Sequence, residues 1–167
     1  MRAVLVFAFV LALVTAGVAQ DWKQVHKKDE AKWAKATGLD PAAIHKMWRA
    51  ASPSEEENDD DSRIANIDLD GLAERHDVML VTYAGERSCL TITVFRQLSE
   101  AKFSKVWSVE KAPDGSGFCD TALGSAKAEA VNGVVLVRVP ANGGRYTVYG
   151  YEWNGITYRL SAQKEVQ

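Results

Sequence analysis

The chain has 167 residues, of which 20 are basic and 22 are acidic, so its net charge is −2. A chain of this length is expected to fold as one domain with a core of its own. The slight negative charge argues against general nucleic-acid binding, because such binding needs a basic face that displaces counterions from phosphates. Nucleic acid is therefore not an expected partner.

The N-terminus has the pattern of a secretory signal. Arg2 precedes an apolar run over residues 3–18, and Gly17 and Ala19 stand at the spacing that a signal peptidase accepts. A membrane anchor needs about 20 apolar residues, and this run is shorter, so a cleaved signal over residues 1–19 is favoured over an uncleaved anchor. We expect an exported protein, periplasmic or extracellular, with no membrane span after cleavage.

Residues 20–51 predict a helical hairpin, with helices at 22–37 and 41–51. Asp40 and Pro41 have the residue types of an N-cap and a first helical position. The apolar residues of the second helix share one stripe: Ile44, Met47, Trp48 and Ala51. We expect this stripe to pack against the rest of the protein, because short helices need tertiary burial to persist. The alternative is that the basic outer faces of the helices bind a partner or a membrane surface.

Residues 52–65 are expected to form an acidic linker. Six of the seven residues from Glu55 to Asp61 are acidic, and like charges at this density repel one another and are usually solvated. A boundary is therefore expected between the helical segment and the remainder of the chain.

The remainder, residues 66–167, predicts an antiparallel β domain. Asn132-Gly133 and Asn154-Gly155 each lie between two β-prone runs, and this dipeptide is a strong hairpin signal because both turn residues adopt positive φ. About seven strands are expected from the alternation of apolar residues: 78–83, 89–96, 103–110, 126–131, 134–139, 145–153 and 156–160. The predicted fold class is α+β, an N-terminal helical hairpin followed by an antiparallel β meander.

Cys89 and Cys119 are the two cysteines of the chain, and both lie in the part expected to be exported, where oxidation is favoured. Only one intramolecular pairing is possible. The two residues are too far apart in the sequence for the usual spacing of zinc ligands. A structural disulfide is therefore expected, in preference to a redox-active or metal-binding pair.

No pattern of residues indicates catalysis. His26, His45 and His76 stand outside any nucleophile or zinc-protease motif. Carboxylates are plentiful, but the sequence alone pairs none of them as general acid and base. We expect a non-enzymatic protein, with a small hydrolase as the less favoured alternative.

One stretch has the ligand spacing of a calcium loop. Oxygen-bearing side chains occur at Asn66, Asp68 and Asp70, Gly71 follows at the turn position, and Asp77 closes the set. Alternate residues would point toward one hard cation, and the glycine permits the sharp turn. The alternative is a solvated acidic turn whose side chains bond to the local backbone. Calcium is the one cofactor that the sequence suggests.

The same stretch resembles the calcium-bearing FG-GAP (VCBS) repeat. Asp68-Leu-Asp70-Gly71, then Asp77-Val78-Met-Leu-Val81, then Leu90-Thr-Ile-Thr-Val-Phe95 look like one degenerate copy, over about 45 of the 167 residues. The resemblance implies a calcium loop that leads into paired strands. A single copy cannot close a propeller, so the resemblance does not imply that architecture.

A loop near the C-terminus resembles another family. Ala141-Asn-Gly-Gly-Arg-Tyr-Thr147, followed by Trp153-Asn-Gly, is similar to the signature loop of small periplasmic C-type lysozyme inhibitors, although the cysteine pattern differs. These are antiparallel β barrels whose loop enters the active site of the enzyme. The resemblance implies a partner-binding loop at Asn142, Gly143, Gly144 and Arg145; the alternative is an ordinary Gly-rich turn.

Tyr149, Tyr151 and Trp153 share one parity of a predicted strand, and such a strip is more often core than a binding face. The favoured function is therefore a secreted or periplasmic binding or interaction module, with calcium as a candidate stabilising ion and another extracytoplasmic protein as the expected partner. The alternatives are an inhibitor of a cell-wall hydrolase and a small hydrolase.

Overall fold

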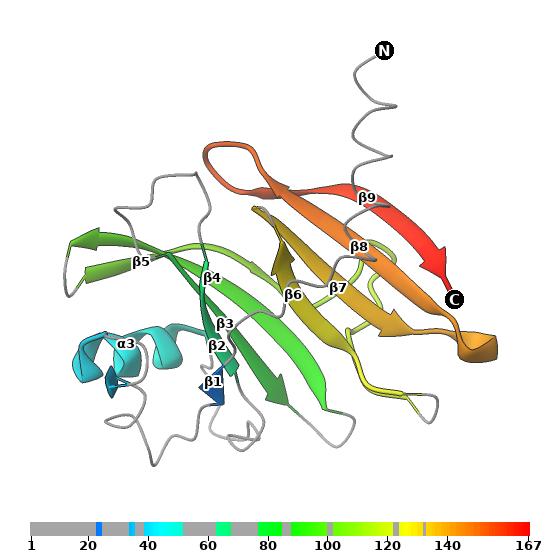
Figure 1. Ribbon diagram of the computed structural model, residues 1–167, viewed down its shortest axis with the longest axis horizontal. Coiled ribbons are helices and arrows are strands. Elements are labelled where there is room, and N and C mark those ends of the chain that lie inside the picture. The colour runs from blue at the N-terminus through cyan, green and yellow to red at the C-terminus, as the bar shows by residue number, and fades with distance from the viewer. Residues whose placement is uncertain are drawn as a thin grey trace.

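Two antiparallel β-sheets face each other and share one core (Figure 1). The computed structural model describes residues 23–24, 34–35, 39–51, 63–67, 77–84, 88–99, 102–121, 124–131 and 133–167. The first sheet contains β1 (Lys23–Gln24), β2 (Arg63–Ile67), β3 (Asp77–Ala84), β4 (Cys89–Ser99) and β5 (Lys102–Val109) in that spatial order. The second sheet contains β6 (Lys127–Val131), β7 (Val134–Pro140), β8 (Tyr146–Trp153) and β9 (Tyr158–Val166), also in chain order.

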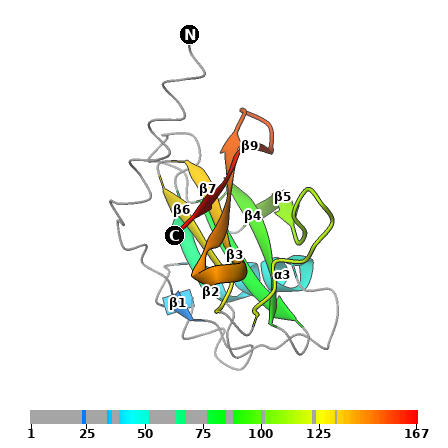
Figure 2. The ribbon, with the colours of Figure 1, turned by 90° about the vertical axis from the view of Figure 1, so that its right-hand side faces the viewer.

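The described residues contain one complete α-helix, α3 (Pro41–Ala51), which covers the outer face of the first sheet (Figures 1 and 2). Asp40 caps the helix as expected, because its Oδ1 accepts a hydrogen bond from the N–H of Ala42 at 3.0 Å. The apolar stripe of α3 packs against Val78, Leu80 and Phe95 of the sheet. The outer face of the helix, by contrast, is exposed and basic.

Strand β3 is buried on both faces. Met79, Val81 and Tyr83 point into the core between the sheets, whereas Val78 and Leu80 point toward α3. Side chains alternate between the two faces of a strand, so an unbroken apolar run is what a strand buried on both sides requires. Each fully buried aliphatic side chain of this kind contributes about 1.5–3 kcal/mol relative to exposure.

The predicted helical hairpin over residues 20–51 is wrong. Lys23 and Gln24 form β1 and pair with Ile64 and Arg63 of β2, so a helix cannot begin at residue 22. Residues 34–35 are helical, and the rest of 22–37 lies outside the described residues. A polar Lys-Gln pair carries no local sign of a strand, because its conformation is fixed by the distant strand with which it pairs.

The predicted linker over residues 52–65 extends too far. Residues 63–65 belong to β2, in which Ile64 packs beneath α3 and Ala65 and Ile67 enter the core between the sheets. Residues 52–62 lie outside the described part of the chain. The fold is therefore mainly β, with a five-stranded and a four-stranded sheet. The predicted α+β class, a helical hairpin followed by an antiparallel meander of about seven strands, is wrong.

The seven strands that were expected individually correspond in position to β3 through β9. Gly133 lies between the paired strands β6 and β7, and Gly155 lies between β8 and β9, with φ of 77° and 97°. The last strand begins two residues later than expected. The cause is Asn154, whose Oδ1 accepts hydrogen bonds from the N–H groups of Ile156 and Thr157.

Residues 110–121 and 124–126 belong to the crossover segment, which leads from β5 of the first sheet to β6 of the second. Phe118 of this segment is fully buried between the sheets, with its ring 5.7 Å from that of Tyr149. The expected disulfide is present and joins Cys89, the first residue of β4, to Cys119 of the crossover. A disulfide indicates an oxidising environment. In the described part of the chain, no helix has the length and apolar character needed to cross a membrane.

Gly117 provides a test of the packing around the disulfide. A Cβ added at this position would lie 2.8 Å from the Sγ of Cys119, so Gly117→Ala is expected to lower the free energy of unfolding by about 1–3 kcal/mol, as overpacking does. Urea denaturation of the oxidised protein measures this change. In a Cys89→Ala/Cys119→Ala background the sulfur is gone and the cost of Gly117→Ala should fall. An equal cost in both backgrounds would contradict this account.

Candidate functional site

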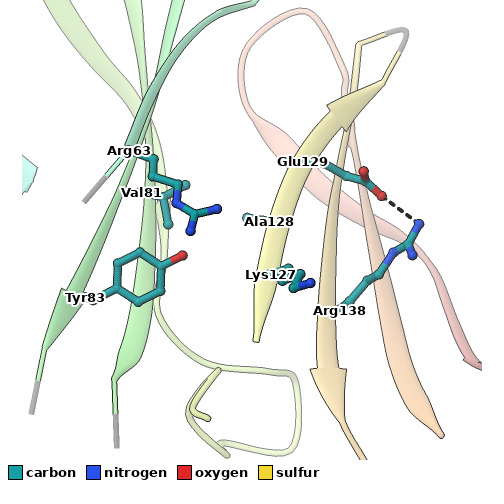
Figure 3. A pocket seen from close by; sticks show the side chains of 7 residues that line it. All are labelled: Arg63, Val81, Tyr83, Lys127, Ala128, Glu129 and Arg138. Carbon is teal, nitrogen blue, oxygen red and sulfur yellow. Dashed lines mark hydrogen bonds and ion pairs between the residues drawn. The ribbon is translucent and has the colours of Figure 1, made fainter. Parts of the chain in front are cut away.

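A recess opens at the seam where β2 and β3 of the first sheet face β6 and β7 of the second (Figure 3). Its volume is about 160 Å³, and seven residues line it: Arg63, Val81, Tyr83, Lys127, Ala128, Glu129 and Arg138. Figure 3 shows the side chains of Arg63 and Tyr83 extending from the first sheet toward β6. The inner face of β6 carries small side chains, Ala128 and Ala130, and this leaves the recess between the sheets.

Strand periodicity positions the side chains at the mouth of the recess. Arg63 has the same parity as Ala65 and Ile67, which lie in the core between the sheets. Arg63 therefore extends the inner face of β2 beyond the apolar core to the mouth. Tyr83 follows Val81 in the same way along the inner face of β3.

The recess is rich in positive charge. Nη2 of Arg138 donates to Oε1 of Glu129 at 2.8 Å, while Nε of Arg138 is buried and has no acceptor in the described structure. Arg63 and Lys127 are exposed, and neither forms an ion pair with another described residue. Figure 3 shows the Arg138–Glu129 pair on the side of β6 and β7 away from Arg63 and Tyr83. Arg63 and Lys127 are therefore the lining cations that have no carboxylate partner among the described residues, and they favour an anion.

A second recess of about 220 Å³ shares Arg63, Tyr83 and Lys127 with the first. It adds hydroxyl groups from Ser88 and Ser125, and it includes the carboxylate of Asp120. Oδ1 of Asp120 accepts the N–H of Ala126 at 2.8 Å, so this carboxylate anchors the start of β6. The two recesses together provide a polar surface along the seam.

No sequence pattern predicted a functional site at the residues that line the seam. Arg63 stood in the segment taken as a linker, and Lys127 and Arg138 are single cations within strands, a pattern that is common on exposed sheet faces. The alternation from Arg63 through Ala65 to Ile67 was the only local signal. The proximity of Arg63 to Lys127 depends on the packing of two sheets, which local patterns do not encode.

The predicted calcium ligands are only partly described. Asn66 pairs with Val78 across β2 and β3, and Ile67 pairs with Asp77, so Asn66 and Asp77 lie on neighbouring strands. The backbone of Asn66 is in β2, but its side chain, like Asp68 and Asp70, lies outside the described residues. The segment thus lies between two paired strands.

Asp77 is fully buried and has protein partners. Its Oδ1 accepts the N–H of Gln97 at 3.3 Å and lies 3.9 Å from Nε of Arg96. A guanidinium at this distance balances the carboxylate without a metal ion. No group of three or more His, Cys, Asp or Glu side chains suited to a metal occurs among the described residues. Calcium binding by the β2–β3 connection stays a prediction.

The predicted partner loop forms a tight turn between β7 and β8, at the lower right of Figure 1. The turn is η2 (Asn142–Gly144), and its three residues and Arg145 are exposed. Nη1 of Arg145 lies 3.0 Å from Oε2 of Glu165, and Nε donates to the carbonyl of Asn142. Arg145 is therefore held against β9. Of the three histidines only His45 is described, on the exposed face of α3.

The aromatic strip of β8 lies in the core. Tyr149 and Tyr151 are buried between the sheets, and the ring of Tyr151 lies 5.1 Å from that of Trp107 in the opposite sheet. Trp107 also lies 5.0 Å from Tyr158. The strip therefore faces the core and not solvent. Its tyrosines stabilise the contact between the sheets and do not form a sugar-binding face.

A cation–π interaction adds to the contact between the two sheets. The guanidinium carbon of Arg96 lies 4.7 Å from the ring centre of Trp153, and Arg96 also faces Asp77. The hydroxyl oxygen of Tyr158 is buried close by and has no hydrogen-bond partner in the described structure. Burial, and then the charge of Asp77, raise the pKa of Tyr158 well above its ordinary value of 10.0, against an opposing effect of Arg96.

Because of these tyrosines, the free energy of unfolding is expected to fall at high pH. Burial, with a smaller effect of Tyr149, raises the pKa of Tyr151 from 10.0 to about 12. Between these values the unfolded chain loses the proton and the folded protein keeps it, so the free energy of unfolding should fall as pH rises above 10. Tyr151→Phe/Tyr158→Phe should show a shallower decline in urea denaturation. A decline as steep as in the unmodified protein would refute the assignment.

No protein-family model, curated protein or solved structure matches this chain. The fold and the seam together define a disulfide-linked protein of two antiparallel sheets with a cationic recess between them. The chemistry of that recess is the basis for a functional assignment.

Proposed function

We propose that this protein is an exported, non-enzymatic binding module, periplasmic or extracellular, that recognises an anionic group in the seam recess. The observation that carries the proposal is the pair of cations Arg63 and Lys127, which stand on opposite sheets and have no ion-pair partner in the described structure. The signal pattern of residues 1–19 and the disulfide support export.

The two cationic donors of the recess have complementary geometries, and together they can bind one acidic group. The guanidinium of Arg63 can bind a carboxylate, sulfate or phosphate through two parallel hydrogen bonds, and Lys127 adds a compact charge. Val81 and Ala128 form apolar walls. The volume of about 160 Å³ is below the range of about 300–1,000 Å³ common for drug-sized ligands, which favours a small acidic head group.

The proposal is tested by titrating the isotope-labelled, oxidised protein with inorganic sulfate, phosphate and acetate, and following backbone amide shifts by NMR. Saturable shifts are expected around Arg63, Tyr83 and Lys127. Arg63→Ala should weaken binding about 10- to 100-fold, because a hydrogen bond to a charged group contributes about 1.5–3 kcal/mol. Lys127→Ala should act in the same direction.

Lys164→Ala is the matched control, because it removes one positive charge from β9, at the opposite edge of the second sheet from β6. It should leave the titration unchanged. Non-saturating shifts of equal size with all three anions would indicate only a nonspecific effect of added salt. Such shifts, or equal weakening of binding by Lys164→Ala, would reject the seam as a binding site.

Inhibition of a cell-wall hydrolase is the second candidate. The exposure of Asn142, Gly143, Gly144 and Arg145 at the end of the second sheet favours it, because a loop that enters an active site must protrude. The contact between Arg145 and Glu165 weighs against it, since the arginine would have to leave β9 to reach an enzyme.

Inhibition is tested by measuring the residual activity of a C-type lysozyme at increasing concentrations of the protein. An inhibitor should abolish activity at stoichiometric amounts, and Arg145→Ala should weaken inhibition at least about 10-fold if the arginine is a hot spot. Arg159→Ala, an exposed arginine of β9, serves as the control. Full lysozyme activity at all concentrations would remove this candidate and would leave the anion-binding proposal unaffected.

A further inference from the structure

A second basic surface lies on the other face of the first sheet, between α3 and β5. A groove of about 140 Å³ separates the helix from the edge of the sheet. Met47, Phe95 and Phe103 form an apolar floor, and Lys46, Lys102 and Lys105 stand around it. Met47 and Phe95 are buried, Phe103 is partly exposed, and all three lysines are exposed.

Among the described residues, the charge around this groove is unbalanced. Neither α3 nor β5 contains an acidic residue, and none of the three lysines forms an ion pair with another described residue. Nζ of Lys105 donates to the carbonyl of Ala50 at 3.3 Å, so one ammonium is positioned at the C-terminal end of the helix. Arg49 lies three residues after Lys46 and adds an exposed cation beside it.

We infer that this lysine-rimmed groove docks the protein onto an anionic lipid surface. The ammonium groups meet the head-group phosphates, and the partly exposed ring of Phe103 contacts hydrocarbon at the outermost part of the lipid layer. The apolar stripe of α3 is packed against the sheet, so the helix does not insert into the bilayer. Binding of this kind is peripheral, reversible and weakened by salt.

The chemistry of the groove favours lipid over a soluble polyanion. An acidic polysaccharide or peptide would need hydrogen-bonding groups along its length, whereas the floor between the lysines consists of methionine and phenylalanine side chains. An anionic lipid combines a phosphate with hydrocarbon over a short distance. This combination matches lysines placed around an apolar floor.

The inference is tested by co-sedimentation of the oxidised protein with vesicles of mixed phosphatidylglycerol and phosphatidylcholine, and with vesicles of phosphatidylcholine alone. Binding is expected only to the anionic vesicles and should decline with salt. Lys46→Gln/Lys102→Gln/Lys105→Gln should weaken it on the order of 100-fold, since each lysine near an anionic surface contributes about a five-fold factor. Circular dichroism verifies that the variant is folded.

The matched control is Lys111→Gln/Arg159→Gln/Lys164→Gln, which removes the same charge from exposed positions outside the groove and should bind almost as tightly as the unmodified protein. Equal losses in the two triple variants, or equal binding to uncharged vesicles, would overturn the inference. Failure to bind vesicles together with lysine-dependent binding of poly-glutamate would overturn it in favour of an acidic polypeptide. Arg63→Ala/Lys127→Ala should leave vesicle binding intact, which separates this surface from the seam.

Discussion

Burial of β3 on both faces is the constraint on which the architecture depends. Val78 and Leu80 support α3, while Met79 and Val81 support the second sheet, so one short strand joins two apolar cores. A strand in this position tolerates little change, because a cavity or an added methyl group is felt by the layer above and the layer below. The rigid strand also positions Tyr83, near its C-terminal end, at the seam.

The two basic surfaces follow from the way the first sheet is covered. On its inner face, the small side chains of β6 do not fill the space opposite Arg63 and Tyr83, and the seam recess results. On its outer face, the short helix α3 leaves Phe103 partly uncovered beside the helix. Both surfaces lie where a covering layer ends, so polar groups can gather there without disturbing the cores. The net charge of the chain is −2, which makes these local concentrations of cations distinctive.

Local chemistry accounts for the parts of the fold that the sequence predicts. Asp40 and Pro41 start α3, Gly133 and Gly155 provide the positive φ between paired strands, and apolar alternation marks the positions of β3 through β9. The errors have a different physical origin. Lys23 and Gln24 form a strand because β2 lies beside them, and β2 is short and follows a dense acidic run. The seam was equally out of reach, because Arg63 and Lys127 meet only after the sheets pack.

The disulfide between Cys89 and Cys119 changes the covalent path between the two sheets. Along the backbone that path passes through most of β4, all of β5 and the first part of the crossover segment. The bond provides a shortcut from the start of β4 to Cys119, shortly before β6 begins. If the protein is anchored at one end and its ligand pulls at the other, tension runs through this shortcut and bypasses residues 90–118. The β4–β5 hairpin would then bear no tension along its own backbone, whereas α3, which forms the other wall of the lysine-rimmed groove, lies outside the closed loop and would carry the load.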